Sequence, residues 1–350
     1  METPIEIRPF SFDAPRHELA AGLELRRVLE HEQFPGDPQL PEAELIGELS
    51  SSTDVVQRRF LVAWSGSEAV GIAEAELQYL DTNRDRCAIE IGVHPAHRRH
   101  GVGRALASHV LDLVADDGRR LTAAWGPISD ENDGFWPALG ADLRLTEQVS
   151  RLELAAVDST LMAQWIDDRT ELAADLELVG WVGRCPDEHI AAYAEMKVAM
   201  NDAPLEDLDW DDEALGIEQM RSFEDSYIRR GSEIWALIVI DPATGAAVAH
   251  TEAQVKTHRP RVSAQWDTVV IPAYRGRRIG RWIKAEMWQR LRRHRPEVEI
   301  LDTGNAAVNE HMLAINHAMG YRYLASYGVW QGETEVMAGR AAQPATGEPG

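Results

Sequence analysis

The chain has 350 residues, and at roughly 150 residues per domain this length predicts about two domains. Hydrophobic residues make up 44% and charged residues 27%, a balance that excludes a fibrous or wholly disordered chain. Lys and Arg number 35 against 58 Asp and Glu, and the net charge of −23 argues against broad binding to nucleic acid or anionic membranes and favours cationic partners.

The two cysteines and the polar first residues indicate in which cellular compartment the protein is expected. Cys87 and Cys185 lie far apart, which excludes a disulfide framework and a cysteine-based zinc site. The first ten residues include no apolar segment of secretory length, and no apolar run of 18 residues occurs. We therefore expect a soluble cytoplasmic protein without a membrane partner.

In the first half of the chain, apolar spacing and turn residues predict strands and two helices. The expected strands are Ile5–Phe10, Arg59–Trp64, Gly71–Tyr79, Cys87–Val93 and Leu121–Trp125, and the expected helices are Glu18–His31 and Val102–Ala115. A connecting helix or linker is expected at Asp158–Glu171.

The second half predicts a similar order. The expected strands are Leu176–Val182, Ile234–Asp241, Ala246–Lys256, Ala264–Ile271 and Val298–Leu301, and the expected helices are Asp187–Met200, Asp212–Arg229 and Ile279–Arg293. Pro242–Gly245 joins two of these strands as a hairpin.

An internal repeat explains the similar order of the two halves. Val93–Arg104 and Val270–Arg281 match at six positions when displaced by 177 residues, and Phe135–Gly140 matches Ile315–Gly320 at a displacement of 180. The simplest interpretation is a duplicated domain, with boundaries at 1–160 and 161–336. The Ala-, Gly- and Pro-rich residues 337–350 are expected to form a disordered tail.

The repeated segment is an arginine- and glycine-containing turn between a strand and a helix. Such a turn presents unpaired backbone N–H groups at the positive end of the helix dipole, which is a ready pyrophosphate site. Gly101 and Gly103 would let the backbone approach the phosphates, and the neighbouring arginines would add donors. The alternative is a helix start with solvated arginines, which the duplication makes the weaker interpretation. Neither copy has the pattern of a Walker loop or of the dinucleotide fingerprint.

The turn resembles the acyl-CoA-binding motif of the GNAT superfamily of N-acetyltransferases, Arg/Gln-x-x-Gly-x-Gly/Ala. Arg98–Gly103 matches every defined position, whereas the second copy has Arg278 where the first glycine is expected. Thr303–Asn305 and Met319–Tyr321 resemble the closing segment of the family. The resemblance covers about residues 3 to 332 and extends to two-domain actinobacterial GNAT proteins, of which mycothiol synthase is a relative.

The resemblance implies two tandem GNAT domains in an α/β fold, each a mixed, mostly antiparallel sheet flanked by helices. It also implies acetyl-CoA as co-substrate and no metal, with the pantetheine arm pairing to the backbone of Val93 and Val270. The residues that it places at the cofactor are Val93, Arg98, Arg99, His100, Gly101, Val102, Gly103, Arg104, Val270, Arg275, Gly276, Arg277, Arg278, Ile279, Gly280, Arg281, Asn305, Asn309 and Asn316.

Direct attack of an amine on the thioester requires a base, because the amine must lose a proton. Glu90 and Asp267 occupy the same position of the two repeats, and strand alternation leaves open which face meets the substrate. A half-exposed structural carboxylate is the equally weighted alternative. The tyrosine that many family members use as general acid is replaced by Trp136 and Asn316. Tyr321 is the substitute candidate, with Tyr323 and Tyr327 nearby, and each could equally be a packing residue.

Three further clusters have simpler interpretations. His94, His97 and His100 lie in the expected phosphate loop without a carboxylate, so no metal site is expected there. Arg290–Arg295 is the basic end of a helix. The acidic stretch 202–213 is either a cation-binding segment or a solvated loop.

The sequence thus predicts an acetyl-CoA-dependent N-acetyltransferase that acts on the primary amine of a small molecule, as a monomer or homodimer. Two alternatives stay open. The protein could bind CoA without catalysing transfer, as a regulatory protein, or only one of the two domains could be catalytic.

Overall fold

Residues 4–343 are described by the computed structural model, and they divide into two compact units. Unit 1 comprises the chain up to residue 146 together with residues 207–211 and the chain from residue 327. Unit 2 comprises residues 147–206 and 212–326. Within the described residues, no helix combines the length and the apolar character needed to cross a bilayer.

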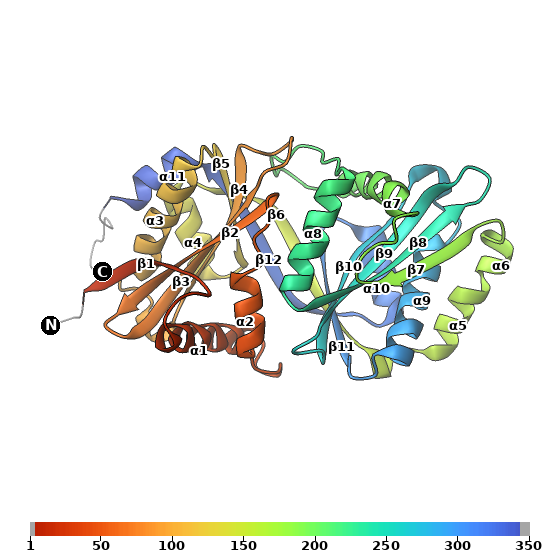
Figure 1. Cartoon of the computed structure of the whole chain (residues 1–350), viewed down its shortest axis with the longest axis horizontal. Coiled ribbons are helices and arrows are strands. Elements are labelled where there is room, and N and C mark those ends of the chain that lie inside the picture. Colours follow the sequence, from red (N-terminus) through yellow and green to blue (C-terminus); the bar gives the residue numbers. More distant parts are fainter. Residues whose placement is uncertain (1–3, 344–350) are drawn as a thin grey trace. The chain divides into compact units, whose positions relative to one another are not determined.

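Unit 1 is a mixed sheet with helices on both faces (Figure 1). Its strand order is β1-β2-β3-β4-β5-β12, in which only β4 and β5 run parallel. The strands are β1 (Ile5–Phe10), β2 (Val56–Ser65), β3 (Glu68–Gln78), β4 (Arg86–Val93), β5 (Leu121–Pro127) and β12 (Arg322–Glu333), and the helices are α1 (Arg16–Gln33), α2 (Glu42–Leu49), α3 (Val102–Asp116), α4 (Asp130–Leu139) and α11 (Thr334–Ala341).

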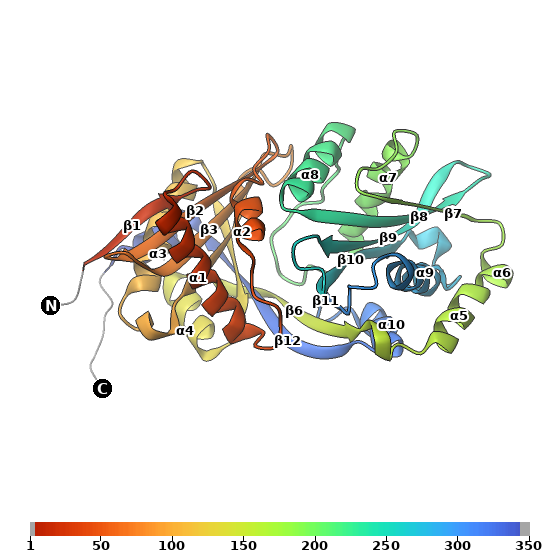
Figure 2. The ribbon, with the colours of Figure 1, turned by 60° about the horizontal axis from the view of Figure 1, so that its bottom comes forward.

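Alternation along β2 shows how the two faces of unit 1 are covered. Phe60 and Val62 pack in the cluster that contains Leu23 and Leu25 of α1, whereas Leu61 packs in the cluster that contains α3 and α11. Because successive side chains of a strand point to opposite faces, α1 and α2 cover one face and α3 and α11 the other. Figure 2 shows α1 and α3 on either side of β2 and β3.

Unit 2 repeats this plan, with the strand order β6-β11-β10-β9-β8-β7 and a parallel β10–β11 pair. The strands are β6 (Asp142–Glu153), β7 (Glu177–Val182), β8 (Ser232–Asp241), β9 (Ala246–Lys256), β10 (Val262–Val270) and β11 (Ile300–Ala306), and the helices are α5 (Ser159–Asp167), α6 (Arg169–Leu172), α7 (Ile190–Lys197), α8 (Ile217–Arg229), α9 (Ile279–His294) and α10 (Glu310–Met319). The predicted α/β fold class, with a mixed sheet flanked by helices, is confirmed, as is the repeated strand, turn, helix and strand.

Each unit takes its closing strand and the following helix from the other repeat. In unit 1, β5 pairs with β12 from Tyr327↔Pro127 to Glu333↔Leu121, and α11 then packs on α3. In unit 2, β11 pairs with β6 from Ile300↔Glu153 to Ala306↔Glu147, and α5 packs on α9. The two repeats have therefore exchanged their closing strand–helix segments.

Because of this exchange, the observed domain organisation differs from the predicted one in three places. The compact units do not follow the boundaries 1–160 and 161–336, because the exchanged segments cross them. The stretch expected to be a connecting helix or linker, Asp158–Glu171, does contain a helix, α5, but this helix belongs to a core, because its Met162 and Trp165 are buried in unit 2. The expected disordered tail is wrong for residues 337–341, because they end α11 with Met337 fully buried, and residues 344–350 lie outside the described residues.

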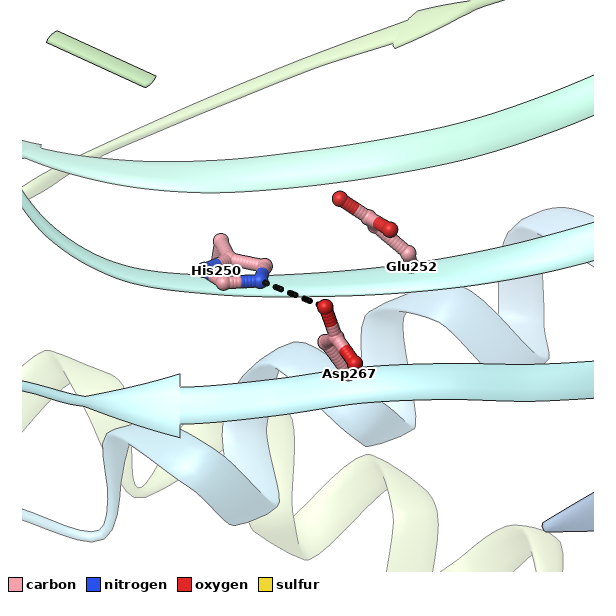
Figure 3. Close-up of side chains that lie close together, drawn as sticks. All are labelled: His250, Glu252 and Asp267. Atoms are coloured by element: carbon pink, nitrogen blue, oxygen red, sulfur yellow. Dashed lines mark ion pairs between the residues drawn. The ribbon is translucent and has the colours of Figure 1, made fainter. Parts of the chain in front are cut away.

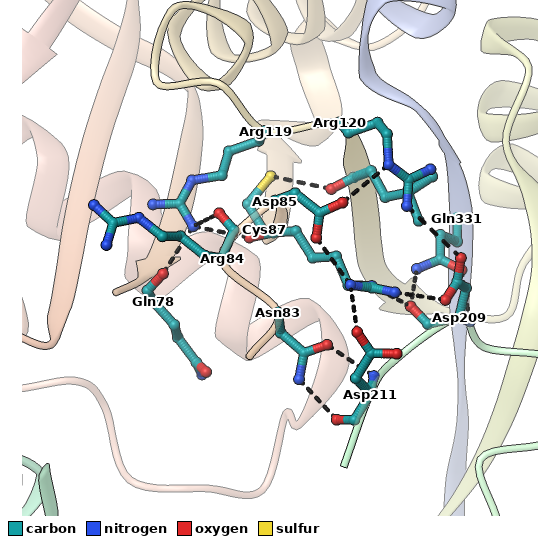
Figure 4. Close-up of polar contacts among 12 residues, drawn as sticks. Gln78, Asn83, Arg84, Asp85, Cys87, Arg119, Arg120, Asp209, Asp211 and Gln331 are labelled. Carbon is teal, nitrogen blue, oxygen red and sulfur yellow. Dashed lines mark hydrogen bonds and ion pairs between the residues drawn. The ribbon is translucent and has the colours of Figure 1, made fainter. Parts of the chain in front are cut away.

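A short acidic segment from the middle of the second repeat, residues 207–211, belongs to unit 1 (Figure 4). The guanidinium of Arg86, only 7% exposed, donates to the backbone oxygen of Asp209 at 2.9 Å and to the carboxylates of Asp209 at 2.7 Å and Asp211 at 3.0 Å. Asn83 exchanges two 2.8 Å hydrogen bonds with the backbone of Asp211. These acids therefore neutralise a buried arginine of the protein itself, which argues against the cation-binding interpretation of this part of the stretch.

Replacing Met337 with Ala tests whether α11 is part of the core of unit 1. Deletion of a buried methionine side chain leaves a cavity, and we expect a loss of about 2–5 kcal/mol in the free energy of unfolding. Val336, 46% exposed on the same helix, is the matched control, and Val336→Ala is expected to change this free energy by less than about 0.5 kcal/mol. Guanidinium unfolding followed by tryptophan fluorescence measures both. Equal stability of the two variants would mean that this segment does not pack as described.

Candidate functional site

The parallel strands of each unit part before they end. In unit 1 the pairing of β4 with β5 runs from Arg86↔Leu121 to Glu90↔Trp125, although β4 continues to Val93. In unit 2 the pairing of β10 with β11 runs only from Val262↔Ile300 to Ala264↔Asp302, although β10 continues to Val270. Beyond these points, the edge of each strand that faced its parallel neighbour has backbone N–H and C=O groups outside the strand pairing. An extended ligand can form hydrogen bonds with these groups.

The turns that follow the parted strands have the same backbone conformation in both units. In unit 1 the left-handed residues are Arg99 (φ 64°) and Gly101 (φ 82°), and in unit 2 they are Gly276 (φ 81°) and Arg278 (φ 57°). The positions correspond, with glycine and arginine exchanged. A Cβ at Gly101 would meet no atom within 4 Å, so the arginine at the equivalent position of unit 2 costs backbone strain but no clash. The departure from the motif at Arg278 therefore leaves the shape of the turn unchanged.

Both turns open a long helix whose start has no side-chain cap. Gly101 precedes α3 and Arg278 precedes α9, and neither N-cap side chain accepts a hydrogen bond from the first turn. A Cβ at Gly103 would lie 3.6 Å from Val93 Cγ2, and one at Gly280 would lie 3.8 Å from Val270 Cγ2. The first helical amides thus lie directly behind the parted strand end, at the positive end of the helix, where an anion is stabilised.

Arg98 and Arg275 brace the turn in the same way in both units. Arg98 Nε donates to the backbone oxygen of Val93 at 3.1 Å, and its guanidinium pairs with Glu32 of α1. Arg275 Nε donates to the backbone oxygen of Val270 at 3.0 Å, and its guanidinium pairs with Asp202 at 2.7 Å. Each of these two arginines therefore connects the strand end to a carboxylate on another segment and so positions the turn.

The other arginines of the two turns also have internal partners, with one exception. Arg104 donates to the backbone oxygen of Arg340 at the end of α11, at 2.7 Å. In unit 2, Arg277 pairs with Asp175, Arg278 pairs with Asp168 at 2.8 Å, and Arg281 stacks over the ring of Trp165. Within the described residues, the exposed side chain of Arg99 makes no hydrogen bond or ion pair.

The remaining predicted cofactor residues stabilise the local fold. His100 Nδ1 lies 2.7 Å from the backbone oxygen of Arg98. Asn309 caps α10 by accepting from the backbone N–H of Met312 at 3.2 Å. Asn316 Nδ2 donates to Asn305 Oδ1 at 2.8 Å and so connects α10 to β11.

Glu90 faces the side of the sheet that α1 and α2 cover. Its neighbours Ile89 and Ile91 pack with α3, so alternation directs Glu90 to the other face. The carboxylate is exposed, and among the described residues it makes no hydrogen bond or ion pair.

The surroundings of Glu90 make it an unusually weak acid. Although the residue is accessible to solvent, surrounding protein atoms displace part of its hydration. This loss, together with the negative charge of Glu74, its direct partner across β3 and β4, raises the pKa of Glu90 to about 7. Arg26 of α1 has its own partner in Glu48 at 3.0 Å, and Arg58 pairs with Glu74 and Glu76, so both only moderate this shift. A carboxyl group with a pKa near 7 is half ionised at neutral pH and suited to accept a proton.

Asp267, at the equivalent position of unit 2, forms an ion pair with Lys197 and lies beside His250 and Glu252, which Figure 3 shows. Lys197 Nζ lies 2.6 Å from Asp267 Oδ2 and 2.8 Å from Glu252 Oε1, and His250 Nε2 lies 3.9 Å from Asp267 Oδ2. Burial alone would raise the pKa of Asp267, but the charge of Lys197 holds it well below its usual range. Burial, reinforced by Asp267, raises the pKa of Glu252.

The sequence analysis did not predict this four-residue cluster of Lys197, His250, Glu252 and Asp267. The donor atoms of His250, Glu252 and Asp267 lie within 4.8 Å of one another, a spacing that a divalent cation could use. Here the ammonium of Lys197 supplies the positive charge. The sequence pattern that could have indicated the cluster is His250-x-Glu252 within one predicted strand, because alternation puts both side chains on one face of β9.

The candidate general acid Tyr321 is wrong as a site residue. Its ring is 3% exposed in the core of unit 2, its hydroxyl has no hydrogen-bond partner, and burial raises its pKa far above the usual value. Trp136 is likewise buried. Tyr327 of β12 lies opposite Pro127 at the end of β5 in unit 1, where its hydroxyl donates to Gln33 Oε1 at 3.2 Å.

The pKa of Glu90 can be measured by carboxyl NMR titration. We expect a value near 7 in the native chain and a lower value in Glu74→Gln, because the substitution removes the negative charge directly opposite. Glu76→Gln is the matched control, since Glu76 contributes least among the charges that raise the Glu90 pKa. Native titration near the ordinary glutamate value of about 4.3 would contradict the described environment.

Comparison with known proteins identifies one matching family profile and several similar folds. Residues 23–134 match the sequence profile of the GNAT acetyltransferase family, and no curated protein sequence matches the chain. A tandem GNAT protein from the clavulanic acid biosynthesis pathway is similar over 95% of this chain and 99% of its own, with a TM-score of 0.76 and 24% identity.

Two further solved structures share the fold. A GCN5-related N-acetyltransferase from Sphaerobacter thermophilus is similar over 94% of this chain and 96% of its own, with a TM-score of 0.67 and 13% identity. The glucosamine N-acetyltransferase region of a fungal multi-domain GH3 beta-N-acetylglucosaminidase aligns over 95% of this chain and 38% of the fungal chain, with a TM-score of 0.65 and 12% identity. GNAT enzymes use acetyl-CoA as co-substrate. The chain therefore matches the GNAT acetyltransferase family over residues 23–134 and shares the fold of tandem GNAT proteins over nearly its whole length.

Proposed function

We propose that the protein is an acetyl-CoA-dependent N-acetyltransferase that acts on the primary amine of a small molecule, and that unit 1 carries out the transfer. One observation carries the proposal: unit 1 has an unpaired carboxylate, Glu90, with a pKa of about 7 on the strand that leads into the acyl-CoA turn. Unit 2 has a carboxylate, Asp267, at the same position, but the ammonium group of Lys197 forms an ion pair with it.

The turn of unit 1 provides the cofactor site. The uncapped amides of Val102 and Gly103 hold the pyrophosphate at the positive end of α3, and exposed Arg99 adds positive charge. The parted ends of β4 and β5 pair with the pantetheine arm near Val93. When bound, acetyl-CoA supplies the thioester. Arg98 acts indirectly, because it fixes the strand end relative to α1.

Glu90 performs the proton transfer that the amine requires. The acceptor arrives as an ammonium ion, which the negative charges of Glu74 and Glu90 attract. Glu90 removes one proton, directly or through a water molecule, and the neutral nitrogen attacks the thioester carbonyl. As the C–S bond breaks, the nitrogen loses a second proton, and the departing thiolate of CoA takes up one proton to become the thiol. When the pKa of a base lies near the working pH, about half of its molecules are ionised. The ionised form still has enough proton affinity to remove a proton from the amine.

The acidic surroundings favour a cationic acceptor such as an amino sugar or a polyamine. The chain carries a net charge of −23, and unit 1 presents Glu74 and Glu90 on opposing positions of β3 and β4. The alternative, a CoA-binding protein without transfer, is favoured by the absence of a tyrosine at the positions of Trp136 and Asn316, which are both buried.

Glu90→Gln separates these two functions. We expect kcat to fall by about 100- to 10,000-fold, and the rise of kcat/KM through pH 7 to disappear, because Gln cannot accept the proton. Thiol release from acetyl-CoA, with glucosamine and spermidine as probe acceptors, measures this. Asp267→Asn, at the matched position, should keep the rate within a few fold. A full-rate Glu90→Gln enzyme excludes Glu90 as the base, and tight acetyl-CoA binding without turnover of any amine supports the alternative.

Substitutions of Gly103 test the cofactor turn. Gly103→Val adds methyl groups at the start of α3, and we expect acetyl-CoA affinity at unit 1 to fall at least tenfold. Gly103→Ala is the control, because its Cβ would make an ordinary 3.6 Å contact with Val93. Calorimetric titration gives affinity and stoichiometry together, and circular dichroism verifies the fold. Unchanged affinity in the Val variant would refute the assignment.

A further inference from the structure

Lys197 places a primary amine at the base position of unit 2. It is the last residue of α7, and its Nζ lies 2.6 Å from Asp267 and 2.8 Å from Glu252. The ring of Tyr193, one turn earlier on the same helix, lies 5.7 Å from the same nitrogen. Its side chain is 18% exposed, so the amine is enclosed but not sealed.

The position of this amine corresponds to that of an acceptor in unit 1. Asp267 lies three residues before Val270, as Glu90 lies three residues before Val93, and each valine ends the strand before a turn of the same conformation. Lys197 also comes from α7, which packs on β9 as α1 packs on β3. The chain thus fills the acceptor position of unit 2 with a nitrogen of its own.

We propose that unit 2 acetylates Lys197, so that this lysine is a self-modification site of the protein. The inference rests on the proposed function, because it requires acetyl-CoA to bind at the turn before α9. It assigns unit 2 a reaction with an internal acceptor, whereas unit 1 acts on an external amine.

The contacts around Lys197 supply the proton transfers. Its ammonium group gives one proton to Glu252, and the neutral Nζ attacks the carbonyl carbon of acetyl-CoA. As the C–N bond forms and the C–S bond breaks, the nitrogen loses a second proton and the CoA thiolate takes up one proton. The net reaction converts the lysine ammonium and acetyl-CoA into acetyl-lysine, CoA thiol and one proton released to solvent.

Glu252 and Asp267 have different parts in this step. Glu252 is the better proton acceptor, because burial and the adjacent Asp267 increase its proton affinity. Asp267 stays ionised and fixes the direction of Nζ. His250 is fully buried with no hydrogen bond to either ring nitrogen, and burial lowers its pKa, so it adds no competing positive charge.

The composition of the chain makes the modification easy to locate. Besides Lys197 the chain has only two lysines, Lys256 and Lys284. Lys284 is 1% exposed inside α9, with its Nζ over the ring of Tyr321 at 5.6 Å, so acetyl-CoA cannot reach it in the folded protein. Lys256 ends β9 and reports background chemical acetylation.

The test is mass spectrometry of the full chain after incubation with acetyl-CoA. We expect a mass increase of one acetyl group that peptide mapping places on Lys197, and no increase at that site in Lys197→Arg. Glu252→Gln should slow the modification at least tenfold. Gly280→Val should abolish it, because the substitution obstructs the turn of unit 2, whereas Gly103→Val at the matched position of unit 1 should leave it unchanged.

Two results would overturn the proposal. One is an unmodified Lys197 in native protein after prolonged incubation, and the other is modification at the same rate in Gly280→Val or in urea-unfolded chain, which would identify it as chemical acetylation. Thiol release with glucosamine or spermidine in the same samples reports unit 1 separately. Loss of self-acetylation with retained transfer to these amines refutes only the present inference, and the reverse result refutes only the proposed external transfer.

Discussion

The exchange of closing strands is the constraint on which both units depend. Without β12, the β5 edge of unit 1 would present unpaired backbone groups, and without β6 the β11 edge of unit 2 would do the same. In the observed structure neither repeat completes its sheet from its own sequence. The pairing of residues 121–127 with residues 327–333 also closes a very long loop, so unit 1 cannot be complete until the end of the chain has been added.

The same exchange supports the site. β5 is held on one side by β12, and on the other side it pairs with β4 only as far as Glu90 and Trp125. Because β12 secures β5, the strand can leave β4 without losing its place in the sheet. Arg104 adds a second connection, since it begins the helix behind the turn and donates to the end of α11. The tail helix and the turn are therefore parts of one structure.

Much of this could be predicted from the sequence, and the rest depends on contacts between distant segments. The repeat located both turns and placed Glu90 and Asp267 at one position, because a duplicated strand and helix keep their local spacing. The sequence did not reveal the exchange, since either closing strand could satisfy either edge. It also did not show that Arg98 and Arg275 have carboxylate partners, because Glu32 and Asp202 are 66 and 73 residues away.

Tyr321 shows a different limit of sequence reasoning. A tyrosine near the closing glycine fits both a proton donor and a core residue, and only the burial of its ring decides between them. Conversely, the second turn departs from the motif at Arg278, whereas its backbone has the same left-handed positions as the first turn. A sequence motif records only which side chains are present, whereas the direction of the backbone amides depends on φ. Arginine can adopt the left-handed φ of this turn at a modest cost in free energy.

The two units show how one backbone arrangement can give a carboxylate two different chemistries. In unit 1 the nearest cations, Arg26 and Arg58, are held by Glu48, Glu74 and Glu76, so Glu90 is left without a partner and its proton affinity rises. In unit 2 the cation contacts the carboxylate directly and lowers its proton affinity. Burial acts on both carboxylates in the same direction, so the difference comes from where the neighbouring cation is bound. The duplication preserved the strand, the turn and the carboxylate, and the ion pairs around them give the two carboxylates opposite shifts in proton affinity.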